Sequence, residues 1–243
     1  MSEPAWQSIT TRVAAAATLA GFDLVQAFNL EHYNAAAPEG ERLDDHVRPD
    51  ALGILLGNTR QLWPVFTRAY AADAALQSAA QPLDSYVVTR LTAVLAEATD
   101  ARVQLVFSHV TTPRAFPIQR LAEHVGLAAL SPSHLVIHPV HGPWLALRAV
   151  VVVDVAGPTN APPPLERPCA GCPAPCVPAL EHALAVSGTP LSSAAVVAHA
   201  DAWIAVRDAC PIGRGSRYGE AQLAYHYGTA GLLRRIAASA HGS

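Results

Sequence analysis

The residues of this 243-residue chain best suited to chemistry are its four cysteines. Three lie in one segment, Cys169-Ala-Gly-Cys172-Pro-Ala-Pro-Cys176, and the fourth precedes a proline, Cys210-Pro211. Two thiolates separated by two residues can bind one metal centre, and a cysteine followed by proline is typical of the last ligand of an iron–sulfur cluster. The spacing predicts a metal site, with a 4Fe-4S cluster favoured over zinc. Buried free thiols are the alternative, which clustering in an otherwise cysteine-free chain disfavours.

A second candidate is Arg148, which interrupts the otherwise apolar run of residues 144–153. A charge inside an apolar strand costs several kcal/mol unless it is paired or faces a polar ligand. Two interpretations stay open. Arg148 forms a buried ion pair with Asp154, Asp201 or Asp208, or it clamps the carboxylate, phosphate or amide groups of a substrate.

Aromatic and histidine residues surround the same segment. Trp144 lies on the same face of the strand as Arg148 if the strand is unbroken, where it is either a wall for a planar cofactor or a core residue. His134, His138 and His141 lie close together around a turn at Gly142. A histidine there is either a metal or axial ligand or, as is commoner, a hydrogen-bonded, half-exposed side chain.

Hydrophobic periodicity and turn residues predict the elements that must position these groups. We expect strands at residues 22–28, 51–56 and 103–107, and a hairpin of residues 135–138 with 144–153. Helices are expected at residues 6–19, 62–70, 85–98, 118–125, 177–185, 191–209, 218–227 and 230–240. The proline-rich residues 158–168 cannot continue a central strand. We therefore expect an α/β core over residues 1–157, and a connector, cysteine loop and helical part over residues 158–243, packed on that core.

Composition excludes several classes of protein. Apolar residues make up 51% of the chain and charged residues 14%, which excludes intrinsic disorder. The net charge is −3, so there is no basic field for nucleic acid. No apolar run approaches the ~18 residues of a membrane span, and Glu3 stands where a signal peptide would be basic. We expect a cytoplasmic protein that binds neither nucleic acid nor membrane.

Several segments together resemble the core shared by epoxyqueuosine reductases and CblC-type cobalamin-processing proteins. The resemblance covers roughly residues 10–235 and rests on medium-length motifs in the same order. The segments common to both branches are Ile118-Gln-Arg-Leu-Ala-Glu-His-Val-Gly-Leu127, Ser133-His-Leu-Val-Ile-His-Pro139 and Pro143-Trp-Leu-Ala-Leu-Arg148. Those that resemble the CblC branch in particular are Phe28-Asn-Leu-Glu-His-Tyr-Asn34, Leu83-Asp-Ser-Tyr-Val87, Arg207-Asp-Ala209 and Arg217-Tyr-Gly-Glu-Ala-Gln-Leu-Ala-Tyr225.

The resemblance implies a nitroreductase-like α/β (α+β) sheet that binds cobalamin, with a helical C-terminal part. In the CblC branch, the upper axial ligand of cobalamin is removed reductively or by transfer to a thiol such as glutathione, with flavin or the thiol as the electron or nucleophile source. Arg148 is similar to a family arginine associated with thiol binding, and the four cysteines resemble one ferredoxin-like cluster of the reductase branch. The expected cobalamin or substrate site consists of Phe107, Ser108, Ile118, Ile137, His138, Trp144 and Arg148.

Departures from the family patterns limit the expected reaction. Thr111, Thr112 and Pro113 occupy the place of the acidic proton donor of the reductase branch, so epoxide reduction on tRNA is not expected. A histidine of the CblC branch is also replaced near this loop, which leaves His109 as the nearest imidazole. No residue is assigned as catalytic.

The expected function is that of an oxidoreductase that reduces cobalamin or removes its upper ligand. Electrons would arrive through one 4Fe-4S cluster from a reductase or ferredoxin, with a thiol as a further partner and FMN as a further cofactor. The alternatives are a non-catalytic cobalamin chaperone with structural zinc, and a flavin-dependent reductase that does not bind cobalamin.

Overall fold

The computed structural model describes residues 3–44, 48–112, 114–160, 162, 165 and 167–228. Its central layer is an antiparallel sheet of four strands in the order β1-β2-β6-β3. These strands are β1 (Leu24–Asn29), β2 (Ala51–Asn58), β6 (Ala146–Ala156) and β3 (Val103–Phe107). A separate two-stranded sheet pairs β4 (Ala129–Leu130) with β5 (Val136–Ile137).

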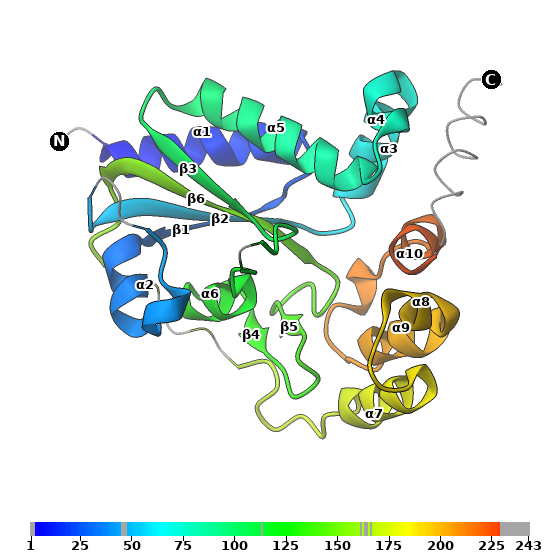
Figure 1. Cartoon of the computed structure of the whole chain (residues 1–243). Coiled ribbons are helices and arrows are strands. Elements are labelled where there is room, and N and C mark those ends of the chain that lie inside the picture. The colour runs from blue at the N-terminus through cyan, green and yellow to red at the C-terminus, as the bar shows by residue number, and fades with distance from the viewer. Residues whose placement is uncertain are drawn as a thin grey trace.

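Helices cover both faces of the large sheet (Figure 1). One face carries α1 (Ala5–Leu19) and α5 (Pro82–Ala98), and the other carries α2 (Leu30–Ala36) and α6 (Ile118–His124). Successive side chains of a strand point to opposite faces. Ile54 and Leu56 therefore join the cluster under α1 and α5, whereas Leu55 joins the cluster on the other face. Because both faces are covered, β2 and β6 read in the sequence as continuous apolar runs.

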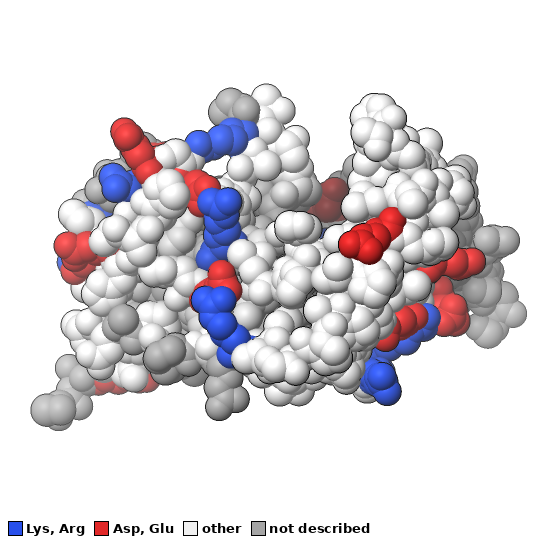
Figure 2. Space-filling view, turned by 90° about the horizontal axis from the view of Figure 1, so that it is seen from below, with Lys and Arg blue, Asp and Glu red and all other residues white. Residues whose placement is uncertain are grey.

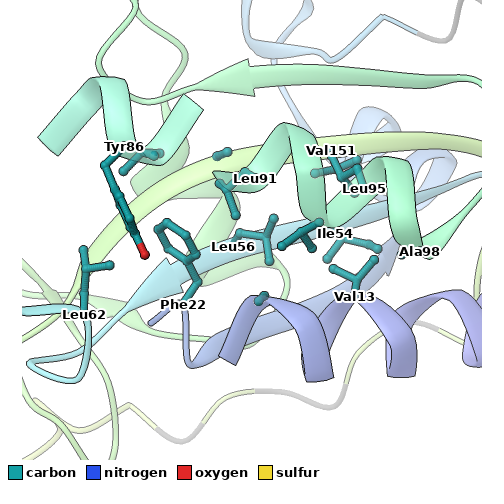
Figure 3. Close-up of a cluster of buried hydrophobic side chains, with 14 of the residues drawn as sticks. Val13, Phe22, Ile54, Leu56, Leu62, Tyr86, Leu91, Leu95, Ala98 and Val151 are labelled. Carbon is teal, nitrogen blue, oxygen red and sulfur yellow. The ribbon is translucent and has the colours of Figure 1, made fainter. Parts of the chain in front are cut away.

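The core under α1 and α5 is the larger of the two clusters. Figure 3 shows side chains from both helices and from the sheet meeting in one layer, among them Val13, Ile54, Leu56, Leu91, Leu95, Ala98 and Val151. Tyr86 is buried at the end of this layer, and its hydroxyl donates to the Ala20 carbonyl oxygen at 2.9 Å. This rigid layer fixes β2 and β6, the strands that carry the candidate site.

The remaining helices lie around one end of the sheet (Figure 1). They are α3 (Leu62–Ala72), α4 (Ala74–Ser78), α7 (Cys176–Ser187), α8 (Ser193–Ala198), α9 (Ala200–Asp208) and α10 (Glu220–Tyr227), with the short 3₁₀ turn η2 (Arg214–Ser216). The other 3₁₀ turn, η1 (Glu39–Glu41), follows α2. Tyr225 of α10 contacts Trp63 and Phe66 of α3, with ring centroids 5.4 and 5.9 Å apart. These contacts place α10 beside the sheet end where β6 begins.

The expected elements are largely present, with two corrections. The hairpin of residues 135–138 with 144–153 is wrong, because β5 pairs with β4 and only a single bridge, His138 with Gly142, closes the turn. Pro143 has no N–H, and the Trp144 N–H bonds to the His141 carbonyl instead of extending a ladder. The expected helix 191–209 is two helices, interrupted at His199 with φ −118° and ψ 36°.

The structure does not test two further expectations. The helix at residues 230–240 lies outside the described residues, and the division of the chain at residue 157 stays a prediction.

Among the helices that the structure describes, none is long and apolar enough to cross a membrane. Figure 2 shows positive and negative side chains interspersed on one face of the molecule, with a broad uncharged area between them.

Candidate functional site

Strand register brings several of the predicted site residues to one end of the large sheet. Asn58 of β2 lies opposite Ala146, and Phe107 of β3 lies opposite Ala149, so Arg148 of β6 falls between them. The Ser108 N–H donates to the Arg148 carbonyl oxygen at 2.9 Å. The structure thus brings Phe107, Ser108 and Arg148 together.

The buried partner of Arg148 is an amide and not a carboxylate. Its Nε donates to Oδ1 of Asn58 at 2.6 Å, and Asn58 is fully buried. Among the described residues, no carboxylate oxygen lies within the 4.0 Å of an ion pair with this guanidinium. Of the two interpretations of Arg148, the buried ion pair with Asp154, Asp201 or Asp208 is therefore wrong. Asp208 is bound by Arg217 at 2.8 Å.

A short chain of hydrogen bonds continues from Asn58 to the nearest carboxylate of this network. The Nδ2 of Asn58 donates to the Thr59 carbonyl oxygen at 2.7 Å. Thr59 then donates to both oxygens of Asp23, from its backbone N–H at 2.7 Å and from its hydroxyl at 2.5 Å. Two neutral residues therefore separate the positive charge of Arg148 from the negative charge of Asp23.

A cavity of about 570 Å³ opens beside Arg148. The Nη2 atom of Arg148 is buried without a hydrogen-bond partner. A buried unpaired donor costs ~1–3 kcal/mol, and more when it is charged, so each such group in a folded protein needs an explanation. The polar side chains that line this cavity with Arg148, from α3, the α4–α5 segment and α10, are Tyr70, Gln77, Gln81, Asp84, Tyr225 and His226.

The environment of the cavity sets the charges of its walls. Burial lowers the pKa of Arg148, but a guanidinium stays protonated in proteins. Desolvation in the cavity, together with the guanidinium groups of Arg148 and Arg207, lowers the pKa of His226, so its imidazole is neutral at pH 7. Burial also raises the pKa of Tyr225, which keeps its phenol neutral. The charged groups among the described lining residues are thus Arg148 and Asp84.

All four cysteines line a second, smaller pocket. Cys176 and Cys210 are buried and Cys169 and Cys172 are half-buried, although Cys210 is 34 positions from Cys176 in the chain. The other residues that line this pocket are mainly apolar: Ser131, Pro132, Ile137, Pro168, Ala174, Pro175, Pro211 and Ile212. Burial and the neighbouring thiols raise the pKa values of Cys169 and Cys210, so both thiols are protonated without a metal.

The cysteine pocket does not have the geometry of a mononuclear site. Among the described residues, no group of three or more Cys, His, Asp or Glu side chains is arranged to hold a metal ion. Tetrahedral zinc with Zn–S bonds of ~2.3 Å requires sulfur atoms only about 3.8 Å apart. The four thiols line one pocket without being arranged as such a group of ligands.

The loop after Cys210 is fixed to the turn that precedes β6. A Cβ added to Gly142, where φ is +56°, would lie 2.0 Å from the Ile212 carbonyl oxygen. A Cβ added to Gly213, where φ is +72°, would lie 2.1 Å from the backbone of His141. Two backbones can approach this closely only because both residues are glycine. His141 Nδ1 also lies 2.9 Å from Oγ of Ser216, which reinforces the contact.

Trp144 packs inside the protein. It is 1% exposed, its ring meets Tyr218 edge-on at 5.4 Å, and the guanidinium carbons of Arg207 and Arg217 lie 5.8 and 5.6 Å from its centre. These contacts are those of a core residue with cation–π neighbours. The role of Trp144 as a wall beside a planar cofactor stays a prediction.

The other predicted site residues lie apart from the Arg148 cavity. Ile118 is buried under the sheet, and Ile137 lines the cysteine pocket. Nδ1 of His138 accepts from the backbone N–H groups of Val140 and His141 at 3.1 and 3.3 Å, and burial lowers its pKa to about 4. The proton of the neutral ring is therefore on Nε2, which makes His138 a donor rather than a ligand through that atom. Binding roles for these three residues stay predictions.

Sequence reasoning gave no role to several residues that build the cavity. Asn58, Thr59 and Asp23 were not singled out, His226 was only part of an expected helix, and Tyr225 was named only as the end of a segment that resembles the CblC branch. A polar residue directly after an all-buried strand is the one local signal that could have drawn attention to Asn58. Its partner, 90 positions away, could not be inferred.

Comparison with known proteins gives a structural likeness only. The sequence matches no protein family and no curated protein. The structure is similar to the crystal structure of the C. elegans B12-trafficking protein CblC, a homologue of human MMACHC, with a TM-score of 0.66 over 96% of both chains and 16% sequence identity. The chain has the CblC fold. The mixed α/β architecture expected from the resemblance is thereby confirmed.

Two epoxyqueuosine reductase structures are also similar, one of them solved with an epoxyqueuosine-modified tRNA-Tyr stem loop. Their TM-scores are 0.44 and 0.48 at 15% and 12% identity, and the match covers 88% of this chain and 68% of each reductase. The likeness to CblC extends over nearly the whole of both chains and is the one on which a function can be proposed.

Proposed function

We propose that this protein binds cobalamin and reduces it or removes its upper axial ligand. The observation that carries the proposal is the CblC fold, matched over 96% of both chains. A fold by itself does not determine a function, so the proposal also needs a site suited to the chemistry. The Arg148 cavity and the cysteine pocket are the two candidates for such a site.

The Arg148 cavity suits a thiol co-substrate with an anionic group. It contains a buried cation with an unused donor, and its volume of about 570 Å³ is that of a small-molecule pocket. In ligand transfer, the thiolate sulfur bonds to the upper alkyl carbon. The carbon–cobalt bond breaks with its electron pair left on cobalt, which passes from Co(III) to Co(I), and the thiol proton goes to solvent. Arg148 would hold the thiol compound through its anionic group and so orient the sulfur.

The spacing of the cysteines favours an iron–sulfur cluster over zinc in the cysteine pocket. Four thiols line one apolar pocket, and Cys210 precedes Pro211, as is typical of the last ligand of such a cluster. Cys169, Cys172, Cys176 and Cys210 would hold a 4Fe-4S cluster, which when bound supplies electrons one at a time. The surrounding prolines and isoleucines would limit the access of water, which is one way in which a protein sets the potential of such a centre.

Cobalamin binding is tested by titrating anaerobically prepared protein into hydroxocobalamin and following the visible spectrum. We expect micromolar or tighter affinity and a shifted spectrum. An unchanged spectrum with excess protein would overturn the proposal. If the cobalamin spectrum is unchanged and the protein itself shows the absorption of FMN, the flavin-dependent reductase becomes the better account.

Turnover is tested with methylcobalamin and glutathione, with S-methylglutathione detected by mass spectrometry. Product that depends on protein supports an enzyme. Tight cobalamin binding without product, in a protein that contains one zinc per chain, would identify a chaperone instead.

A further inference from the structure

Among the described residues, Arg148 forms no ion pair, although the carboxylate of Asp84, which lines the same cavity, interacts with it electrostatically. A buried guanidinium usually pairs with a carboxylate, because the attraction offsets the cost of removing the charge from water. Here the nearest bonded partner is the neutral amide of Asn58, and Asp23 lies beyond Thr59. Asp84 lines the same cavity and is the other charged group there among the described residues, but no ion pair joins it to Arg148.

The hydrogen bonds fix which nitrogen atom of the guanidinium is used. Asn58 donates its amide nitrogen to the Thr59 carbonyl, so its amide oxygen must face Arg148 and accept from Nε. Thr59 donates to both oxygens of Asp23, which keeps that carboxylate engaged away from Arg148. The Nη2 atom is left buried and unpartnered on a residue that lines the cavity.

We propose that Asn58 is a positioning residue that holds Arg148 through Nε and leaves Nη2 for a carboxylate group of the thiol co-substrate. This inference rests on the proposed role of the cavity as the thiol site. A neutral amide orients the guanidinium without cancelling its charge. A ligand carboxylate can then form charge-assisted hydrogen bonds where water is largely excluded, so the pairing is stronger than at the surface.

The replacement Asn58→Asp tests this arrangement directly. An aspartate would keep the size and the acceptor but would supply a carboxylate within the 2.6 Å of the present contact. It would pair with Arg148 and cancel the charge that the ligand needs. Asn29→Asp is a matched control: Asn29 is also buried at a strand end, at 6% exposure, but it caps α2 and lies at the opposite end of β1 from the cavity. Aspartate is as good as asparagine at a helix N-cap.

The experiment measures glutathione binding to the full chain by calorimetry, with hydroxocobalamin binding measured on the same samples. We expect Asn58→Asp to raise the Kd for glutathione at least roughly tenfold, which is the loss of one charge-assisted contact, while cobalamin affinity is unchanged. Asn29→Asp should bind glutathione like the wild type. The diethyl ester of glutathione, which lacks the carboxylates, should bind the wild type as weakly as glutathione binds Asn58→Asp.

The possible outcomes separate this inference from the proposed function. Wild-type affinity in Asn58→Asp, or no glutathione binding to a wild type that binds cobalamin, would overturn the inference and leave cobalamin binding intact. Glutathione binding that is sensitive to Asn58→Asp in a protein that does not bind cobalamin would support the inference and overturn the proposed function. If Asn58→Asp does not fold, Asn58→Ser replaces it: a weaker complex supports the positioning role and an unchanged Kd contradicts it.

Discussion

The Arg148 cavity and the cysteine pocket are built in opposite ways. The residues that hold Arg148 come from adjacent strands of one sheet, whose register is fixed by a buried core on both faces. The cysteines come from loops and helix ends, and Cys210 is held in place by the backbone contact between residues 212–213 and 141–142. We infer that the cavity is preorganised by the sheet, whereas the cysteine pocket depends on one loop contact and on the group that it binds.

The strongest test of this contrast is the removal of one cysteine. Anaerobically prepared protein should contain about four iron atoms per chain, and Cys210→Ala should lose essentially all of them, since one missing thiolate opens the site. Iron analysis and the absorption spectrum measure this. Arg148→Met should keep its iron, because the cavity does not depend on the cluster. One zinc per chain, retained in air, would refute the redox role and make the cysteine site a folding element.

The loop contact is tested by Gly142→Ala. The new Cβ would meet the Ile212 carbonyl at 2.0 Å, at a residue whose φ is +56°. We expect a loss of roughly 4 kcal/mol in the free energy of unfolding, from backbone strain and overpacking together. Cys210 should also react faster with iodoacetamide, since its loop is displaced.

Gly188→Ala is the control for this variant. Gly188 also has a positive φ, of +76°, but nothing lies within 4 Å of the added Cβ. Its ψ of 178° places Gly188 in a region that is essentially limited to glycine, so Gly188→Ala should lose about 1 to 3 kcal/mol from backbone strain alone. It should leave the reactivity of Cys210 unchanged. Equal effects of the two substitutions would mean that the contact at Gly142 does not hold the loop.

The preorganised cavity is tested by substitutions of Arg148. Arg148→Lys keeps the charge but loses the planar fork, so the Kd for glutathione should rise roughly tenfold, and Arg148→Ala should weaken binding further. Calorimetry measures both. Arg148→Met keeps most of the volume without the charge. If Arg148→Met folds and binds glutathione like the wild type, the arginine serves packing and not binding.

The smallest expected effect concerns the turn that joins the two regions. The pKa of His138 is lowered to about 4, below the ~6.5 of an unfolded chain. The folded state therefore favours the neutral ring, and the stability gained is fully present above pH 6.5 and is lost as the pH falls toward 4. Because the ring is partly open to solvent, we expect a contribution of about 1 kcal/mol.

Denaturant titrations at pH 7.5 and pH 5 measure this contribution. His138→Asn can still accept a hydrogen bond from the turn but does not titrate, so it should reduce the pH dependence. A pH dependence equal to that of the wild type would assign the effect to another group, of which His226, with its lowered pKa, is the first to test.

Local patterns in the sequence predicted most of the elements because each pattern is short-range. The strand at residues 103–107 was predicted with its observed bounds, and the helix expected at 6–19 is observed as Ala5–Leu19. The hairpin was wrong because its two segments have strand-like composition, while pairing depends on which N–H groups the turn leaves free. At the turn, Pro143 lacks an N–H and the His141 carbonyl is already bonded to Trp144.

The sequence by itself determined that four cysteines with this spacing belong together and that a charge in an apolar strand requires a partner, since both follow from the cost of burying such groups alone. Only the tertiary structure decided what the partner is. Arg148 meets Asn58 because the register of β2 and β6 shifts between the pairs Leu56–Ala149 and Gly57–Leu147, which leaves Arg148 as the extra residue of β6 close to Asn58. Register is set by the summed packing of the whole core, which no single residue encodes.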